Sequence, residues 1–230
     1  MGAEPEVLIV LGGSFNPPHI GHLRLAIEAA EFFAPQCVEV LLVPCARPPH
    51  KASEGFLPFA LRCRLLEAST AKLPALRVSR MEGERTTLSY TWETLWTLRQ
   101  RTQALLYVLV GSDDYLALST WYKGLELPKL AHFLVVPRGS FAEEDFVRAT
   151  LALWPMAQSL SATGRHWLLS EGGEVSYLAI PWLDVSSTDI RKRFLAQKSL
   201  DFLVPSAVLD ILHEQAEEIR SIWAWKGIHS

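Results

Sequence analysis

The sequence has few cysteines and no excess of basic residues. Its three cysteines, Cys37, Cys45 and Cys63, are odd in number and none forms a C-x-x-C pair. We therefore expect structural thiols of a reducing compartment rather than disulfides or a zinc site. Lys and Arg total 22 against 25 Asp and Glu, which leaves a formal net charge of −3. A weakly acidic chain lacks the broad basic patch of a general nucleic-acid binder, so nucleic acid is not an expected partner.

Long apolar segments are also missing. The apolar runs at residues 7–11 and 104–110 are too short to cross a bilayer. The acidic start of the sequence lacks the basic residues and the longer apolar core of a signal peptide. Glu6 occupies the position where the myristoylation pattern requires Ser or Thr. We therefore expect a cytoplasmic protein without a membrane partner.

What the sequence does contain is an alternation of strand-like and helix-like segments up to about residue 140. Five apolar runs have strand length: Val7–Leu11, Val38–Val43, Leu76–Ser79, Leu105–Val110 and Phe133–Val136. Their continuous apolar character is typical of parallel strands buried on both faces. Helical spacing occupies the stretches between them: Leu23–Phe33, Pro58–Ala71, Thr91–Arg101 and a short segment after Asp113. The alternation predicts an α/β fold, a Rossmann-like, doubly wound and mainly parallel sheet.

The last third of the chain is less regular. Residues 141–154 have helical spacing, residues 158–166 resemble a loop, and short strands at 166–170 and 174–180 flank a Gly-Gly turn. Two helices are expected at the end, at Thr188–Ala196 and Pro205–Arg220. We expect a single domain over residues 1–230, with a core at about 6–185 and a small C-terminal helical part at about 186–222. The tryptophans that follow, Trp223 and Trp225, look exposed.

The segment from Gly12 to His22 carries the strongest functional signal. It reads GGSFNPPHIGH and lies where the first strand should end, the edge at which open α/β sheets bind ligands. Gly12 and Gly13 permit close approach of a ligand to the backbone, and the N–H groups of the next helix favour a phosphate. His19 and His22 are three residues apart and share one face of a helix start. Two imidazoles placed there can donate hydrogen bonds to a phosphate whose charge builds up in a transition state.

Other interpretations of this loop are weaker. It matches neither G-x-G-x-x-G nor the Walker pattern, which argues against a dinucleotide oxidoreductase and a P-loop enzyme. Two histidines at this spacing can ligate zinc, but no third ligand is nearby in the sequence. An ordinary strand-to-helix turn with two hydrogen-bonded histidines is the other alternative.

A second polar segment precedes the helix expected at residues 188–196. Ser187, Thr188 and Asp189 are good N-cap residues. The same hydroxyls and N–H groups can also bind phosphates, with Arg191 as the cation, because an arginine fork suits phosphate better than a lysine does. A plain helix cap is the alternative interpretation of this segment.

Six ordered segments resemble one enzyme family. His19-Ile20-Gly21-His22 resembles the HxGH signature of the nucleotidyltransferase superfamily. The longer first loop resembles the start of nicotinate/nicotinamide mononucleotide adenylyltransferases, the bacterial nicotinate type in particular. The further matches are Val43-Pro44 with Arg47-Pro48-Pro49-His50-Lys51, Ser89-Tyr90-Thr91, Gly111-Ser112-Asp113, Ser119-Thr120-Trp121-Tyr122 and Asp184–Arg191. Together the matches span about residues 8–210.

The resemblance implies transfer of an adenylyl group from ATP to nicotinate mononucleotide, a late step of NAD biosynthesis. It implies Mg²⁺ as the cofactor, held mainly by the substrate phosphates and by no protein ligand that we name. A homo-oligomer is compatible with the sequence. We expect catalytic roles for three residues: His19, His22 and Arg191.

The expected binding residues fall into two sets. Those for ATP are Gly12, Gly13, Ser14, Phe15, His19, His22, Gly111, Arg138, Ser187, Thr188 and Arg191. Those for the mononucleotide are Asn16, Lys51, Tyr90, Thr91, Asp113 and Trp121. The resemblance implies that Trp121 stacks on the pyridine ring and that main-chain N–H groups near Tyr90 and Thr91 receive the nicotinate carboxylate. Arg138 is included because it follows the fifth apolar run, and Lys51 because it follows a proline pair.

Asn16 departs from the family pattern. Bacterial enzymes usually have Asp there, and Asn is commoner in the eukaryotic branch. A nicotinamide mononucleotide or dual-specificity adenylyltransferase is therefore the nearest alternative. Pantetheine-phosphate adenylyltransferase is more distant, because its chains lack the S-Y-T and tryptophan segments. An aminoacyl-tRNA synthetase fragment does not fit because no K-M-S-K-S-like loop is present. The alternative from another class is a non-catalytic pyridine-nucleotide sensor.

Overall fold

The structure is a computed structural model that describes residues 5–49, 55–181 and 183–224. The cysteines are free thiols: Cys37 is exposed, Cys45 half-buried and Cys63 buried. Burial raises the pKa of the Cys63 thiol, which keeps it protonated. Within the part of the chain that is described, no helix has the length and apolar composition that a membrane span requires.

The strands form one mainly parallel sheet in the order β3-β2-β1-β4-β5-β8-β7-β6. Their bounds are β1 Val7–Gly13, β2 Val38–Pro44, β3 Leu76–Val78, β4 Leu105–Gly111, β5 His132–Val136, β6 Gln158–Ser159, β7 His166–Leu168 and β8 Glu174–Tyr177. β1, β4, β5 and β8 pair in parallel, with Val7 opposite Leu105 and Phe133 opposite Val175. β7 and β6 extend the sheet in antiparallel fashion. The order reverses between β1 and β4, as in Rossmann-like folds, which confirms the predicted fold class.

Helices follow most strands, as the sequence pattern predicts. Their bounds are α1 Ile20–Phe32, α2 Phe59–Thr70, α3 Thr91–Arg99, α4 Ser112–Leu116, α5 Glu143–Leu153, α6 Ser187–Leu195, α7 Ser206–Glu214 and α8 Ala216–Ala224. Two 3₁₀ turns, Leu118–Thr120 and Gly124–Lys129, follow α4. The chain divides into two compact units, one of residues 1–12, 28–41 and 90–182, the other of residues 13–27, 42–89 and 183–230.

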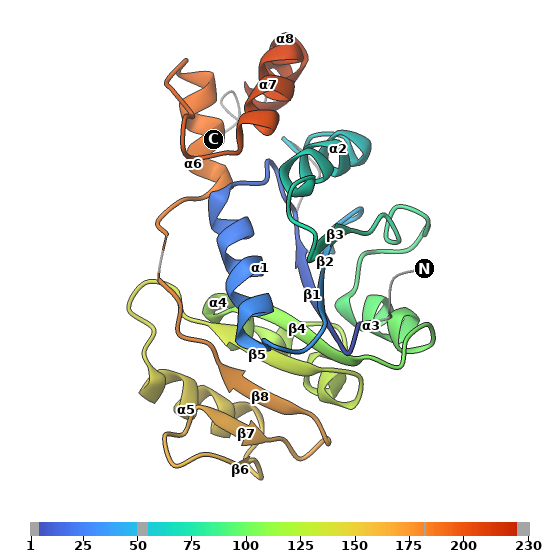
Figure 1. Cartoon of the computed structure of the whole chain (residues 1–230), viewed down its shortest axis with the longest axis vertical. Coiled ribbons are helices and arrows are strands. Elements are labelled where there is room, and N and C mark those ends of the chain that lie inside the picture. The colour runs from blue at the N-terminus through green and yellow to red at the C-terminus, as the bar shows by residue number, and fades with distance from the viewer. Residues whose placement is uncertain (1–4, 50–54, 182, 225–230) are drawn as a thin grey trace. The chain divides into compact units, whose positions relative to one another are not determined.

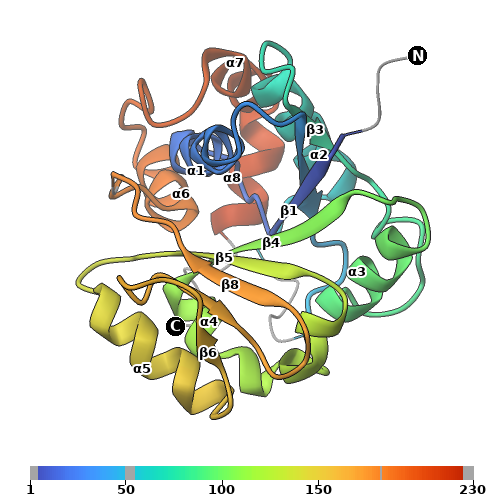
Figure 2. The same cartoon turned by 60° about the horizontal axis from the view of Figure 1, so that its bottom comes forward.

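The first unit is built on β4, β5 and β8, and α5 lies beside the end of the sheet that carries β8, β7 and β6 (Figure 2). Its core is aromatic: Tyr115, Phe133 and Phe146 are fully buried, and Trp154 packs against the first two. The Tyr115 hydroxyl lies 2.7 Å from Thr150 Oγ1. Because burial strongly raises its pKa, this hydroxyl stays protonated.

The second unit contains the C-terminal helices, and α2 lies beside α7 (Figure 1). Its core collects the apolar sides of α2, α6, α7 and α8. Trp223 belongs to this core. It is only 4% exposed and packs edge-on to Phe194, with ring centroids 5.2 Å apart. The expectation that Trp223 is exposed was therefore wrong, because α8 continues to Ala224 and turns this side chain inward. Trp225 lies outside the described residues.

The clearest differences from the predicted boundaries lie in the last third of the chain. The helix expected at Pro205–Arg220 is two helices that break at Gln215. The apolar spacing runs on from Val208 and Leu212 through Ile219, so periodicity alone cannot reveal the break. The short strand β6 lies within the segment expected to be a loop. The strand expected at residues 174–180 ends at Tyr177, where its pairing with β5 stops.

Candidate nucleotidyl-transfer site

The two histidines of the first loop lie against each other at the start of α1. Their rings stack with centroids 3.6 Å apart, and the His19 carbonyl accepts the backbone N–H of His22 at 3.0 Å. The His19 backbone N–H donates to Nδ1 of His22 at 3.2 Å. A neutral His22 must therefore carry its proton on Nε2, which makes Nε2 the donor atom of the ring. A hydrogen-bond donor at the N-terminus of a helix is suited to a phosphate oxygen.

The glycines of this segment have different roles. At Gly21, an added Cβ would lie 3.0 Å from the His19 ring and 3.0 Å from Val185, so glycine is what allows the histidine to pack here. A Cβ at Gly13 would lie 3.1 Å from the Phe15 ring, and the backbone of Phe15 has a positive φ of 46°. Gly12 is exposed, and a Cβ there would have no neighbour within 4 Å among the described residues. The space beside Gly12 is thus open, whereas the Phe15 ring fills the space beside Gly13.

Asn16 uses its side chain on the protein itself. It is 2% exposed; its Nδ2 donates to the Gly55 carbonyl at 2.8 Å and its Oδ1 accepts the Leu57 N–H at 3.0 Å. An aspartate cannot donate to a carbonyl, so the amide is the form that satisfies both partners. The structure thus gives Asn16 a loop-fastening role, whereas the sequence predicts contact with the mononucleotide.

Arg62 is the residue that sequence reasoning missed. It is 2% exposed on α2, with Nη1 donating to the Ser14 carbonyl at 2.8 Å and Nε to the Leu57 carbonyl at 3.0 Å. Burial lowers the pKa of its guanidinium, although an arginine stays charged. One signal in the sequence points to Arg62: helical spacing places this cation on the same buried face of α2 as Leu65 and Leu66. Arg62 fixes the backbone of the first loop at Ser14.

The N-terminus of α6 is attached to the same loop. Ser186 caps the helix: its Oγ accepts the Asp189 N–H at 3.1 Å. Ser187 Oγ donates to the Pro17 carbonyl at 2.8 Å. The N-cap role that the sequence predicts for this segment falls on Ser186, one residue earlier than proposed. The cap leaves the first N–H groups of α6 next to the proline pair.

Arg191 also reaches the first loop. Its Nη1 donates to the Asn16 carbonyl at 2.8 Å and its Nη2 to Thr188 Oγ1 at 3.0 Å. The side chain is half-buried, and burial lowers the pKa of the guanidinium without neutralising it. A guanidinium has five N–H donors, so two such bonds orient it and leave capacity for a phosphate. The second unit therefore brings together His19, His22, Ser187, Thr188 and Arg191.

A second group of predicted residues lies in the first unit, at the ends of β4 and β5. Arg138 Nη1 lies 3.6 Å from Asp113 Oδ2, and its backbone N–H donates to Ser112 Oγ at 3.0 Å. A Cβ at Gly111 would lie 3.3 Å from Cδ of Arg138, so glycine makes room for that side chain. Both charged side chains are largely exposed, which leaves them accessible to a polar ligand.

The same unit places Tyr90 near the tryptophan segment. Tyr90 is the N-cap residue of α3, directly before Thr91, and its ring lies 4.7 Å from that of Tyr122. Trp121 occupies a tight turn: it donates to the Leu118 carbonyl and accepts the Gly124 N–H. A Cβ at Gly124 would lie 1.8 Å from the Leu118 oxygen, so this turn requires glycine. The structure thus places the Tyr90–Tyr122 pair at the N-terminus of α3. A ligand ring that carries a carboxylate needs both an aromatic surface and N–H donors.

One predicted residue, Lys51, lies outside the described residues. The loop that leads to it is held by Ser89, whose Oγ accepts the N–H groups of Ala46 and Arg47 at 3.1 and 3.0 Å. The serine of the S-Y-T segment therefore has a structural role that motif matching alone did not assign.

Within the described residues, no group of three or more His, Cys, Asp or Glu side chains is arranged to hold a metal ion. Mg²⁺ in nucleotide enzymes is commonly bound through substrate phosphates and water with few protein ligands.

Comparisons with known protein families and individual sequences identify the family of the chain. The sequence profile of the Cytidylyltransferase-like family matches residues 10–193. The chain is 35% identical over 214 residues to a probable nicotinate-nucleotide adenylyltransferase of Pelobacter propionicus, an alignment that covers 90% of this chain and 95% of that protein. It is 37% identical over 204 residues to the protein of that name from Pseudomonas fluorescens, covering 87% and 91%.

Solved structures show the same fold. A nicotinic acid mononucleotide adenylyltransferase of Plasmodium falciparum, solved in complex with NaAD, has a TM-score of 0.71 at 16% identity. The match covers 94% of this chain and 98% of that one. A nicotinate-nucleotide adenylyltransferase structure from Vibrio parahaemolyticus gives a TM-score of 0.61 at 18% identity and covers 94% and 96%. On these matches the chain belongs to the Cytidylyltransferase-like family of nucleotidyltransferases, and within it to the nicotinate-nucleotide adenylyltransferases.

Proposed function

We propose that this protein transfers the adenylyl group of ATP to nicotinate mononucleotide. A phosphate oxygen of the mononucleotide attacks the α-phosphorus of ATP, a new P–O–P bond forms, and pyrophosphate leaves with the electrons of the broken bond. The products are nicotinic acid adenine dinucleotide and pyrophosphate. The observation that carries the proposal is the joining of the stacked His19–His22 pair and the α6 N-terminus, with Arg191, on a single loop.

The second-unit residues would act on the phosphates. His22 would donate from Nε2 to an oxygen of the reacting phosphate, and His19 would hold the ring of His22 in the required tautomer through its backbone N–H. Arg191, already oriented by Asn16 and Thr188, would neutralise charge on the pyrophosphate. Because no covalent enzyme intermediate is needed, positioning and charge stabilisation account for the whole contribution of the protein.

The first-unit residues would bind the rest of the substrates. Asp113 would accept a ribose hydroxyl, and Arg138 beside it would approach ATP. Trp121 would stack on the pyridine ring, while the N–H groups at the start of α3, near Tyr90 and Thr91, would receive the carboxylate. Mg²⁺ would be held by the phosphates of ATP and would supply charge neutralisation there.

The nearest alternative is a nicotinamide mononucleotide or dual-specificity enzyme, which Asn16 first suggested. In the structure both polar atoms of the Asn16 amide are bonded to Gly55 and Leu57, so this residue gives that alternative no direct support. We also propose a cytoplasmic location for the enzyme.

The test is direct detection of the product. The protein is incubated with ATP, Mg²⁺ and nicotinate mononucleotide, and the dinucleotide is identified by mass spectrometry alongside one equivalent of pyrophosphate.

His22→Ala should lower kcat by ~10²–10³-fold with unchanged secondary structure, because it removes a transition-state donor. His166→Ala is the matched control: this half-buried histidine on β7 pairs with Glu174 and has no role in the proposed reaction, so the variant should keep nearly full activity. A drop in kcat of less than about tenfold in H22A would remove His22 from the role assigned here. If the protein binds the mononucleotide but forms no product, it is instead a non-catalytic pyridine-nucleotide sensor.

A further inference from the structure

A pocket of about 250 Å³ lies in the second unit, among the C-terminal helices. Its lining comes from α6, the segment that follows it, α7 and α8, and includes none of the residues discussed as substrate-binding. The lining residues are Phe194, Gln197, Lys198, Ser199, Leu200, Asp201, Leu209, His213 and Arg220. Nothing in the proposed reaction uses this pocket.

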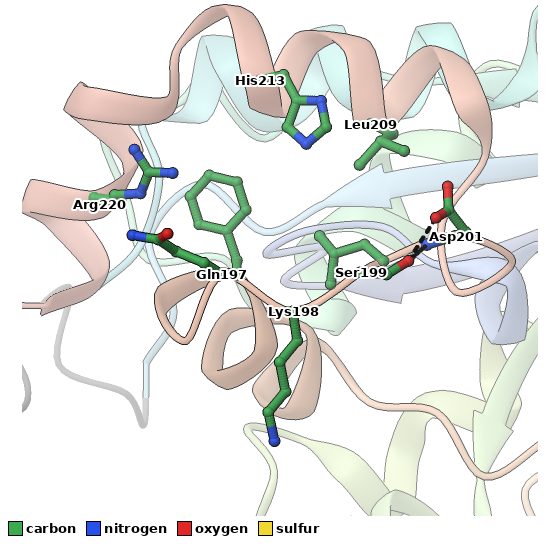
Figure 3. A pocket seen from close by; sticks show the side chains of 9 residues that line it. Gln197, Lys198, Ser199, Asp201, Leu209, His213 and Arg220 are labelled. Carbon is green, nitrogen blue, oxygen red and sulfur yellow. Dashed lines mark hydrogen bonds between the residues drawn. The ribbon is translucent and has the colours of Figure 1, made fainter.

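The side chains divide the pocket into an apolar wall and two polar ends. Phe194 and Leu200 are buried, and the guanidinium carbon of Arg220 lies 5.4 Å from the centroid of the Phe194 ring. Figure 3 shows the Gln197 amide beside this guanidinium, and Asp201, bonded to Ser199, at the opposite end. The arginine fork and the amide offer donors to an anion next to an aromatic surface.

The Lys198 ammonium points away from the other lining side chains, and His213 projects toward them from α7 (Figure 3). Arg220 is therefore the permanent positive charge that faces the space, and a ligand with one negative charge would match it. Asp201 would repel a second negative charge placed at its end.

The pocket is open to solvent, and its volume indicates the size of ligand that it can hold. A cavity of ~150 Å³ is enough to hold a benzene ring, whereas pockets for drug-sized ligands start at ~300 Å³. A pocket of about 250 Å³ therefore has room for one aromatic ring with one small substituent. The lining favours a ligand whose carboxylate meets the Arg220 guanidinium, itself packed on Phe194, and whose ring lies along the apolar wall toward Leu209.

Hydrogen bonds hold the segment between α6 and α7 that lines the pocket. Arg193 Nε and Nη2 donate to the Ser199 carbonyl at 3.0 and 2.8 Å, and the Lys198 N–H donates to the Arg193 carbonyl at 2.9 Å. The Asp201 N–H donates to Ser199 Oγ at 3.0 Å. A segment fixed in this way loses little further freedom on binding, which favours affinity.

The pocket is also connected to the phosphate-binding residues through two elements. The carbonyl of Leu203, two residues after Asp201, accepts the N–H of Ile20 at 3.0 Å, and Ile20 stands between His19 and Gly21. Phe194 lies one turn after Arg191 on α6, and Arg191 donates to Asn16. A ligand that shifts either element changes the setting of a residue that the reaction uses.

We propose that this pocket is an effector site for a small aromatic monocarboxylate and that its occupancy changes the turnover of the enzyme. The binding part is independent of the proposed function, and the effect on turnover rests on it. An effector must bind with different affinities to two conformations of the protein, which here differ in the position of Ile20 or Arg191. A change in turnover on binding reports that difference in affinity.

Benzoate is the probe, and benzamide is its uncharged analogue. Binding is measured by calorimetry without ATP or mononucleotide. We expect benzoate to bind with at least about tenfold higher affinity than benzamide and Arg220→Gln to remove that advantage. Lys198→Gln is the matched control and should keep it, because that ammonium points away. His213→Ala, which should weaken benzoate binding, serves as the second variant should R220Q fail to fold.

Equal affinities for benzoate and benzamide would overturn the proposal of a carboxylate site at Arg220. Undiminished affinity for benzoate in R220Q would overturn it too. Benzoate binding that is lost in Trp121→Ala and kept in R220Q would overturn it as well, because the acid would then occupy the mononucleotide site. The calorimetry decides these points even if no adenylyl transfer is found.

Turnover is then measured at saturating ATP and nicotinate mononucleotide. Benzoate should change kcat by about two- to fivefold in the wild-type protein and leave R220Q unaffected. Binding with unchanged kcat would overturn the effector role, and inhibition that nicotinate mononucleotide relieves would show competition instead. Absence of turnover without benzoate would contradict the proposed function and leave the calorimetric result standing.

Discussion

At the scale of single residues, the first loop depends on the buried cation Arg62, which fixes its backbone at Ser14. Arg62→Met would leave the carbonyls of Ser14 and Leu57 without their donors. Because a hydrogen bond from a charged group contributes about 1.5–3 kcal/mol, we expect the loss of both bonds to lower the free energy of unfolding by about 3–6 kcal/mol. Urea unfolding measures the loss, and the KM for ATP should rise because Ser14 is no longer fixed.

The matched control for this variant is Arg64→Met on the same helix. Arg64 pairs with Glu214 at 3.1 Å, but the two side chains are 50% and 60% exposed. A surface ion pair of this kind contributes at most about 1 kcal/mol. Equal losses in R62M and R64M would contradict the fastening role of Arg62.

Trp121 can be tested at the same scale. Trp121→Ala should raise the KM for nicotinate mononucleotide about tenfold or more while that for ATP changes little, because stacking acts on the pyridine ring alone. Trp96→Ala removes a tryptophan that is 53% exposed on α3 and should change neither constant. Steady-state kinetics with each substrate varied in turn gives both values. An equal rise in both KM values would remove Trp121 from the pyridine subsite.

At the scale of the element, the cap of α6 sets the position of Arg191. Ser186→Ala removes the acceptor for the Asp189 N–H and should lower the free energy of unfolding by about 1 kcal/mol, as loss of an N-cap does. It should also lower kcat, because Arg191 lies in the second turn of this helix. Ser187→Ala is the control for stability: it removes one hydroxyl bond to Pro17 but leaves the cap in place. A stability loss in S187A as large as that in S186A would contradict the assignment of the cap to Ser186.

At the scale of the whole molecule, the sequence predicts the fold class because the largely buried strands β1, β2, β4 and β5 are visible in it as continuous apolar runs. The first loop was also predictable, since its glycines, prolines and histidines are rare in this combination. The break at Gln215 was not, because the apolar spacing continues across it. Arg62 and Asn16 show the same limit: their roles depend on backbone carbonyls and N–H groups far away in sequence, and no local pattern reports such partners.

The whole molecule is proposed to transfer an adenylyl group from ATP to nicotinate mononucleotide, and one measurement tests this most directly. Pyrophosphate release is followed in steady state with ATP and Mg²⁺, comparing nicotinate mononucleotide with nicotinamide mononucleotide as the second substrate. We predict a kcat/KM at least about tenfold higher for the acid, because N–H donors at the start of α3 favour a carboxylate over an amide. Comparable values would contradict the acid-specific assignment, and no release with either substrate would contradict adenylyl transfer itself.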